Sequence, residues 1–306
     1  MRILVVGAGS TGGYFGGRLS QAARDVTFLV RPNRAARLRA RGLEILSPLG
    51  DVTLHPGIVT ADEITGPYDL VLVSVKAFAL EAALADVAPA IGPDTMILPV
   101  LNGMKHMDLL ATRFGAERLL GGVCKIMGRI DDEGRIVQMS PLQELTYGET
   151  DGTRSARIEA LDAVMQGAGF DAHLSDHILL DMWEKWVFLA SLGATTCLLR
   201  GSIGEVAAAG GKTIALAIVA ESTAIAQAAG FDPRPAFLAW AQAQLTTDGS
   251  PMTSSLYRDL SQGNPVEADQ IIGDLAARAR AFGIPTPLLE AVGVALKLYE
   301  NRRAQA

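Results

Sequence analysis

Short, continuous runs of apolar residues alternate with helix-like patterns along the first half of the chain. The runs are Ile3–Val6, Val26–Val30, Leu70–Val73 and Met96–Leu98. Such runs are typical of strands that are buried on both faces of a parallel sheet, whereas half-exposed strands alternate apolar and polar residues. Because strands that alternate with helices form layered α/β folds, the pattern predicts an N-terminal Rossmann-type, doubly wound sheet.

The pattern changes twice further along the chain. The segments 135–138 and 144–147 are predicted to be antiparallel strands around a turn at 132–134. Helices are then predicted over about 176–199, 211–229, 233–246, 265–282 and after Pro287. We therefore expect a Rossmann-type domain of residues 1–175, followed by an all-α C-terminal domain of residues 176–306.

Composition and charge narrow the class of protein. The chain has 306 residues, of which 49% are hydrophobic and 20% are charged, so a large core can be buried. A net charge of −6 argues against binding to nucleic acids or to anionic membranes. Two cysteines are too few for a disulfide framework, and no apolar run reaches the roughly 20 residues of a membrane span. A soluble, cytoplasmic protein is expected.

A glycine-rich loop follows the first predicted strand directly. It consists of Gly7, Ala8, Gly9, Ser10, Thr11 and Gly12, and it opens the first predicted helix. Glycines at this spacing allow a tight turn, a close approach of the backbone to a pyrophosphate, and close packing of helix on strand. The N-terminus of the helix adds partial positive charge for the phosphates. Elsewhere in a chain the same spacing would indicate an ordinary turn, but between a strand and a helix it predicts a dinucleotide site.

The residue after the second strand indicates which dinucleotide binds. An NAD site places an acid there to accept a hydrogen bond from the ribose 2′-OH, whereas this chain has Arg31. An arginine offers paired donors to a 2′-phosphate, so the sequence favours NADP(H). Arg34, Arg37, Arg39 and Arg41 follow closely, and we interpret these four as a solvated helix face.

Two polar residues follow later strands. Lys76 comes after the strand 70–73, and Asn102 comes after the strand 96–98. Ligands bind at the carboxyl ends of the strands in open α/β sheets. Taken singly, Lys76 would be a solvated lysine and Asn102, before Gly103, a turn former. Because both residues lie at this edge of the sheet, cofactor binding by both is as good an interpretation as the two structural ones.

A single lysine lies inside a long apolar stretch of the second half. Lys185 is flanked by Trp183 and Trp186, and further apolar residues follow. These neighbours leave little of the helix surface to water, so the lysine can serve as a proton donor to a carbonyl oxygen. The alternative is a lysine on the helix surface beside Glu184.

Two further polar positions also have structural interpretations. The segment 264–267 has the order Asn-Pro-Val-Glu, so Glu267 could close a capping box at the start of a helix. Ser254 and Ser255 could begin a helix after Pro251. The four histidines are scattered without metal-ligand spacing, and we expect no metal site.

Together these motifs resemble the ketopantoate reductase family over nearly the whole chain. The matching segments are 7–19, 73–76, 101–104, 183–185 and 255–259, followed by Glu267. The glycine loop is common to many dehydrogenases, whereas the ordered set is far more specific; it consists of Lys76, Asn102, Lys185, Ser255 and Glu267. The resemblance implies NADPH-dependent reduction of the ketone of 2-dehydropantoate to (R)-pantoate, a step of pantothenate biosynthesis.

The resemblance also implies a role for each matched residue. Lys185 corresponds to the general acid that polarises the carbonyl, and Glu267 to the acid that positions this lysine and reaches the cofactor. Asn102 corresponds to a residue that contacts both cofactor and substrate. Ser255 corresponds to a contact of the substrate carboxylate, and Arg31 to a ligand of the 2′-phosphate.

Four positions depart from the pattern of the family. Family members have asparagines four and eight residues after the lysine, where this chain has Leu189 and Gly193. Two further family asparagines correspond to Ile203 and Met252. Because a site built to bind a hydroxyl loses its preference when its partners are removed, we expect an altered substrate pocket at Leu189, Gly193 and Met252.

Three functions remain open from the sequence. The first is the reduction of 2-dehydropantoate with Lys185 as general acid. The second is the reduction of a less polar 2-oxoacid or ketone on the same scaffold. The third is a non-catalytic, NADP(H)-sensing protein whose helical domain binds a partner. The apolar helical domain also allows a homodimer, while no nucleic-acid or membrane partner is expected.

Overall fold

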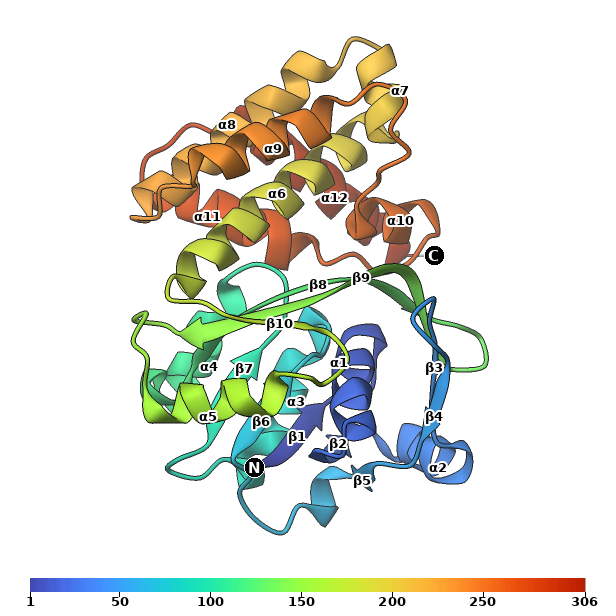
Figure 1. Cartoon of the computed structure of the whole chain (residues 1–306). Helices are drawn as coiled ribbons and strands as arrows, with labels where there is room; N and C mark the ends of the chain where they lie inside the picture. The colour runs from blue at the N-terminus through green and yellow to red at the C-terminus, as the bar shows by residue number, and fades with distance from the viewer. Residues whose placement is uncertain (306) are drawn as a thin grey trace. The chain divides into compact units, whose positions relative to one another are not determined.

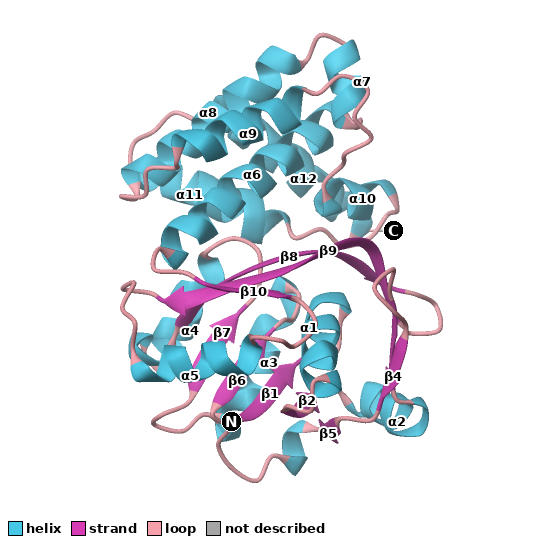
Figure 2. Ribbon diagram, in the orientation of Figure 1, coloured by secondary structure: helices cyan, strands magenta, loops and turns pink. Residues whose placement is uncertain are grey.

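The computed structural model describes residues 1–305 (Figures 1 and 2). Contacts within the chain divide it into two compact units. The first unit comprises Met1–Leu101 and His106–Ile178, and the second comprises Asn102–Lys105 and the chain from Leu179 onward. Within residues 1–305, every strand lies in the first unit. None of the helices in this range is long and apolar enough to cross a membrane.

The first sheet contains five parallel strands in the order β5-β2-β1-β6-β7. These strands are β1 (Arg2–Val6), β2 (Asp25–Leu29), β5 (Gly57–Val59), β6 (Leu70–Val73) and β7 (Met96–Pro99). The strand order reverses between β1 and β6, and ligands bind at such a switch point in open α/β sheets. The predicted doubly wound, Rossmann-type sheet is therefore confirmed.

Helices and short 3₁₀ turns lie between the strands of the first unit along the chain. The helices are α1 (Ser10–Gln21), α2 (Pro32–Arg41), α3 (Leu80–Val87), α4 (Lys105–Phe114) and α5 (Ala156–Met165). The 3₁₀ turns are η1 (Ala61–Glu63), η2 (Ala77–Ala79), η3 (Ala88–Ala90) and η4 (Ala116–Arg118).

Helix α1 lies between the first sheet and a second one (Figure 1). A Cβ atom on Gly16 would come within 2.8 Å of Val5 in β1, and one on Gly13 would come within 2.4 Å of Ile136 in the second sheet. The absence of side chains at these two positions therefore lets α1 pack closely against both sheets.

The second sheet has the order β10-β9-β3-β4, with β8 antiparallel to β9. Its strands are β3 (Leu43–Leu46), β4 (Val52–Leu54), β8 (Leu120–Ile130), β9 (Ile136–Glu149) and β10 (Asp171–Leu174). The predicted turn at 132–134 is present, and the segments 135–138 and 144–147 are antiparallel strand, but both lie on the single strand β9 and pair with β8 rather than forming two separate strands. Pro141 and the polar residues around it interrupt the apolar pattern of one long strand, and the ladder is irregular there, between Ile126 and Gly128.

The second unit is helical, as predicted. It contains α6 (Ile178–Leu199), α7 (Ile203–Ala208), α8 (Lys212–Ala228), α9 (Pro235–Thr246), α10 (Ser255–Ser261), α11 (Asp274–Ala281) and α12 (Pro287–Arg303). A π-helical turn, η5 (Asp269–Gly273), leads directly into α11. The first residue of α6, Ile178, belongs to the first unit by its contacts.

The helix predicted over 265–282 begins later, so the capping-box interpretation of Glu267 is wrong. The main-chain N–H of Val266 donates to Glu300 Oε1 (3.0 Å), and the Asn264 carbonyl accepts from the Tyr299 hydroxyl (2.8 Å). The segment before η5 is therefore fixed by α12 and not by a cap of its own. At α10 the prediction is confirmed, because Ser254 Oγ accepts from the N–H of Tyr257 (2.9 Å).

Candidate active site

The glycine loop forms a tight turn between β1 and α1. Gly7 has a φ of +94°, and its N–H donates to the Leu29 carbonyl at the end of β2 (3.0 Å). A Cβ atom on Gly12 would lie 1.8 Å from Ser74 Oγ and 2.7 Å from the Gly7 carbonyl. The Ser74 hydroxyl also donates to the Val6 carbonyl (3.1 Å), so it joins the carboxyl ends of β1 and β6. Any side chain at Gly12 would therefore break this junction.

The N-terminus of α1 is open and has no capping side chain. Gly9 is the N-cap residue, no acidic residue lies in the first turn, and a Cβ atom on Gly9 would meet nothing within 4 Å. Ser10 and Thr11, both half-buried, form that first turn. The first N–H groups of a helix lack partners within the helix and attract anions. This combination fits the phosphates of a dinucleotide.

The arginines after β2 have different environments. Arg31 is exposed and immediately precedes α2. The interpretation of the next four arginines as a solvated face is wrong for Arg34, which is half-buried and donates to the carbonyls of Ala8 (3.3 Å) and Gly134 (2.9 Å). Arg39 is exposed, as expected, and pairs with Glu63. The sequence pattern could not show the contact of Arg34 because Gly134 lies in the distant β8–β9 turn.

Lys76 is exposed and lies between β6 and η2. It follows the same strand end as Ser74, whose hydroxyl contacts the glycine loop. The sequence prediction included the segment that contains Ser74 but assigned it no role.

Helix α6 holds Lys185 between buried residues. Trp183, Glu184 and Trp186 are each at most 5% exposed, while Lys185 itself is half-buried. The indole of Trp183 packs against Trp186 (4.9 Å between ring centroids) and stacks on Phe231. These contacts fix the backbone of α6 around Lys185.

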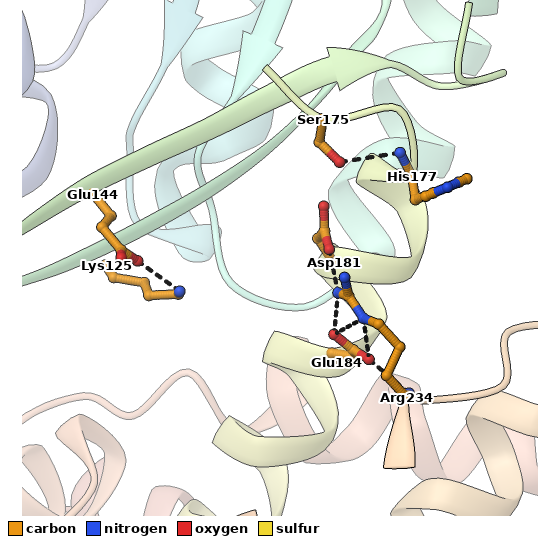
Figure 3. A network of polar contacts seen from close by, with 7 residues as sticks. All are labelled: Lys125, Glu144, Ser175, His177, Asp181, Glu184 and Arg234. Carbon is orange, nitrogen blue, oxygen red and sulfur yellow. Dashed lines mark hydrogen bonds and ion pairs between the residues drawn. The ribbon is translucent and has the colours of Figure 1, made fainter. Parts of the chain in front are cut away.

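The carboxylate of Glu184 faces Arg234 on the buried side of α6 (Figure 3). It accepts hydrogen bonds from the main-chain N–H (2.7 Å) and from Nε of Arg234 (2.9 and 3.0 Å), and Asp181 also pairs with this guanidinium. The hydrogen bond to Glu184 raises the pKa of Arg234 above its ordinary value, against the effect of burial. Glu184 is therefore an internal anchor of the helix, paired with Arg234. Figure 3 also shows His177 donating its N–H to Ser175 Oγ (3.0 Å), and the ion pair of Lys125 with Glu144 in the β8–β9 ribbon.

The π-helical turn η5 contacts two of the predicted segments. The Trp186 indole, next to Lys185, donates to the Ile271 carbonyl (2.9 Å). Gln270 Nε2 donates to the Asn102 carbonyl (3.0 Å). Glu267 lies one turn before, and its carbonyl accepts from the N–H of Ile271 (3.2 Å).

The segments that hold the three predicted catalytic residues, Lys185, Asn102 and Glu267, therefore converge on one π-helical turn. Such turns are frequent at functional sites. Gln270 was missed from the sequence because a lone glutamine within a helix gives no signal.

Gly103 allows the Asn102 segment to approach η5 closely. Its φ is +79°, and a Cβ atom there would lie 2.5 Å from the Gln270 carbonyl. The Asn-Gly pair is therefore a turn former, and it also places Asn102, half-buried, beside η5.

The predicted substrate residues lie on α6 and around α10. Leu189 is half-buried and Gly193 is buried; a Cβ atom on Gly193 would meet Leu256 at 3.3 Å. Ser255 is exposed as the first residue of α10. Neither Leu189 nor Gly193 has a polar side chain.

Ile203 and Met252 belong to a hydrophobic cluster. Ile203 is fully buried in it, and Met252 packs against it from the outside. The N–H of Ile203 donates to the Met252 carbonyl (3.0 Å), so the two positions are backbone neighbours. Ile203 is therefore a core residue, and Met252 lies at the edge of the same cluster.

Comparisons with known proteins agree over almost the whole chain. The family model Ketopantoate reductase PanE/ApbA matches residues 3–152, and its C-terminal counterpart, Ketopantoate reductase PanE/ApbA C terminal, matches residues 177–300. The chain is 36% identical over 304 residues to the uncharacterized oxidoreductase YkpB of Bacillus subtilis (strain 168), covering 99% of this chain and 100% of the relative. It is 26% identical to a 2-dehydropantoate 2-reductase of Mesorhizobium japonicum, covering 95% of each chain.

Solved structures show the same fold. The crystal structure of 2-dehydropantoate 2-reductase from Geobacter metallireducens GS-15 has a TM-score of 0.87 and 30% identity, covering 97% of this chain and 99% of that one. A ternary structure of D-mandelate dehydrogenase with NADH and anilino(oxo)acetate has a TM-score of 0.88 at 21% identity, covering 99% and 100%, which is a likeness of fold alone. The protein described above belongs to the ketopantoate reductase family of oxidoreductases.

Proposed function

We propose that this protein reduces the ketone of a 2-oxoacid with NADPH, and that 2-dehydropantoate is the first candidate substrate. Membership of the family supports the reaction class. The observation that carries the proposal is the convergence of the Lys185, Asn102 and Glu267 segments on η5. A sensor without catalysis would not need these three segments to meet at one turn.

Lys185 is the proposed general acid. When bound, a reduced nicotinamide supplies a hydride to the ketone carbon. The ammonium group of Lys185 stabilises the negative charge that develops on the ketone oxygen and then protonates this oxygen. Glu267 is the proposed acid that positions Lys185. Trp183 and Trp186 hold the helix backbone on either side of this lysine.

The N-terminal unit supplies the proposed cofactor site. The open N-terminus of α1 and the space at Gly9 fit the pyrophosphate. The exposed guanidinium of Arg31 favours a 2′-phosphate over a free 2′-OH. Arg31→Ala should therefore weaken NADPH at least about 10-fold more than NADH, whereas an equal loss for both would refute the preference for NADPH.

A less polar 2-oxoacid is the second candidate substrate. Leu189 and Met252 stand where amides would bind the hydroxyl and carboxylate of 2-dehydropantoate, and Ile203 is buried in a hydrophobic cluster. Neither of the two half-buried side chains, Leu189 and Met252, can donate a hydrogen bond to a hydroxyl. The D-mandelate dehydrogenase structure of similar fold contains anilino(oxo)acetate. This ligand supports a less polar 2-oxoacid as a substrate for the same scaffold.

The test is NADPH oxidation by the purified protein with 2-dehydropantoate beside a panel of bulkier and less polar 2-oxoacids. The first candidate predicts the highest kcat/KM for 2-dehydropantoate. The second predicts a higher value for an apolar 2-oxoacid, and Leu189→Asn should then raise kcat/KM for 2-dehydropantoate while lowering it for the apolar substrate. No oxidation with any member of the panel, despite NADPH binding, would refute the reductase and favour the sensor.

A further inference from the structure

Two arginines of α2 meet beside the glycine loop. Arg34 donates from Nη2 to the Ala8 carbonyl and from Nη1 to the Gly134 carbonyl. A Cβ atom on Gly134 would lie 2.7 Å from Arg34 Nη1 and 2.8 Å from Arg37 Cζ. Both guanidinium groups therefore lie at one point, between the phosphate-binding loop and the β8–β9 turn.

The positive charge at this point has no acidic partner. Neither Arg34 nor Arg37 forms an ion pair within residues 1–305. Of the three acids in the nearby turn, Asp131 and Glu133 are bound by Arg135, and Asp132 is exposed. The partners of Arg34 are neutral carbonyls. Burial, followed by the charge of Arg37, lowers the pKa of Arg34. Two like charges held together in a half-buried place are stabilised by a bound anion.

The arginines also follow a helical spacing that begins at Arg31. Arg31, Arg34 and Arg37 are three residues apart, which places neighbours of the series on adjacent turns of one helix face. Helix α2 has no side-chain cap and no acid in its first turn, so its N-terminus adds positive potential. Arg34 has five N–H donors, and its two hydrogen bonds to carbonyls leave others for a ligand.

We propose that Arg34 and Arg37 bind the 2′-phosphate of NADPH together with Arg31. The proposal rests on the proposed use of NADPH. It extends the 2′-phosphate site from Arg31 alone to three arginines. A dianionic phosphate monoester matches the charge of the pair, and guanidinium groups bind such phosphates through paired hydrogen bonds. Arg34 is in addition a positioning residue of the glycine loop, because it holds the Ala8 carbonyl.

The binding of adenosine 2′,5′-bisphosphate and of 5′-AMP to the full-length protein tests the proposal by calorimetry. The two probes differ only in the 2′-phosphate, and neither depends on turnover. Arg37→Ala should weaken the bisphosphate about 10-fold and leave 5′-AMP within about twofold, because Arg34, and not Arg37, forms the hydrogen bond to the Ala8 carbonyl of the glycine loop. Arg34→Ala should weaken the bisphosphate at least as much, and Arg34→Lys should restore part of the loss. Arg39→Ala is the matched control on the same helix; since Arg39 is engaged by Glu63, neither probe should change.

The outcomes separate this proposal from the choice of cofactor. If the unmodified protein binds both probes equally, the use of NADPH is refuted and the proposal falls with it. If the protein prefers the bisphosphate and only Arg31→Ala removes that preference, NADPH use stands and the role of Arg34 and Arg37 is overturned. Equal weakening of both probes by Arg34→Ala, with no effect of Arg37→Ala, would likewise reduce Arg34 to a structural contact and overturn the proposal.

Discussion

The indole nitrogen of Trp186 donates a hydrogen bond to the main-chain oxygen of Ile271, 2.9 Å away. Trp186 follows the proposed general acid Lys185 directly, and the N–H of Ile271 in turn binds the carbonyl of Glu267. The chain segments that carry the two charged residues of the proposed chemistry are therefore joined through the backbone of a π-helical turn. This relationship makes the position of Lys185 sensitive to residues that never touch a substrate.

Replacement of Trp186 by Phe tests this tie. The variant keeps an aromatic ring but loses the donor, at a cost of about 1 kcal/mol for the hydrogen bond in addition to the lost packing. We expect kcat to fall several-fold more than in Trp183→Phe. That variant shortens an indole in the same way, but the Trp183 indole contacts the rings of Trp186 and Phe231. Denaturant unfolding and steady-state kinetics measure the two effects. Equal kcat values in the two variants would show that the bond to Ile271 does not position Lys185.

Gly103→Ala tests the approach of the Asn102 segment to η5. A positive φ costs a non-glycine residue about 1–2 kcal/mol, and at Gly103 the added Cβ would also meet the Gln270 carbonyl at 2.5 Å. Gly210→Ala is the matched control, since Gly210 has a φ of +83° but no atom within 4 Å of such a Cβ. We expect both variants to lose stability and only Gly103→Ala to lose kcat/KM substantially. Unaltered kinetics in Gly103→Ala would remove Asn102 from the site.

In the glycine loop, we expect Gly12 to be needed for the fold and Gly9 to be needed for cofactor binding. Gly12→Ala would place a Cβ atom 1.8 Å from Ser74 Oγ, so we expect a clear fall in melting temperature. Gly9→Ala meets no protein atom within 4 Å, so we expect a near-normal melting temperature but at least about 10-fold weaker NADPH binding, because the backbone must approach the pyrophosphate there. Differential scanning calorimetry and fluorescence titration measure the pair. Normal NADPH affinity in Gly9→Ala would place the cofactor elsewhere.

Glu149 gives the N-terminal unit a stability that depends on pH. Burial favours the protonated form of this carboxyl, but hydrogen bonds from Arg157 and Ser155 outweigh it and lower the pKa. The resulting stabilisation is complete above the unfolded-state pKa of about 4.3 and is lost as the pH falls through the lower folded-state pKa. Glu149→Gln should therefore lower the free energy of unfolding by about 1.5–3 kcal/mol at pH 7.

Urea unfolding across pH 3–7 measures this effect. The difference between the unmodified protein and Glu149→Gln should shrink below about pH 4. Glu159→Gln, at an exposed position of the following helix α5, is the control and should stay near the unmodified protein throughout. A difference that does not change with pH would show that the charge of Glu149 is not what stabilises the unit.

The sheet could be predicted from the sequence because its strands are buried on both faces. Ile3 and Leu72, for example, are completely buried, and continuous apolar runs of this kind have few other interpretations. The β8–β9 ribbon was mispaired because its apolar pattern breaks at Pro141 within one strand. A local pattern does not reveal that such a strand continues.

The residues of the proposed chemistry could be named from motifs, whereas the contacts around them could not. Motifs point to Lys185, Asn102 and Glu267, but not to Gln270, Arg234 or the contact of Arg34 with Ala8. Each of these three contacts joins two residues that lie 26 to 168 positions apart in the chain. Such contacts depend on tertiary packing and cannot be predicted from the spacing of residues in the sequence.

The most direct test of the account is single-turnover oxidation of NADPH by Lys185→Ala with the best substrate of the panel. Lys212→Ala is the control, since Lys212 pairs with Asp248 at the surface of the same unit. A general acid contributes about 10²–10⁴ to the rate, so the account predicts a loss of that size in Lys185→Ala, with NADPH affinity unchanged and with Lys212→Ala at the normal rate. Turnover by Lys185→Ala within a few-fold of the unmodified protein would contradict it.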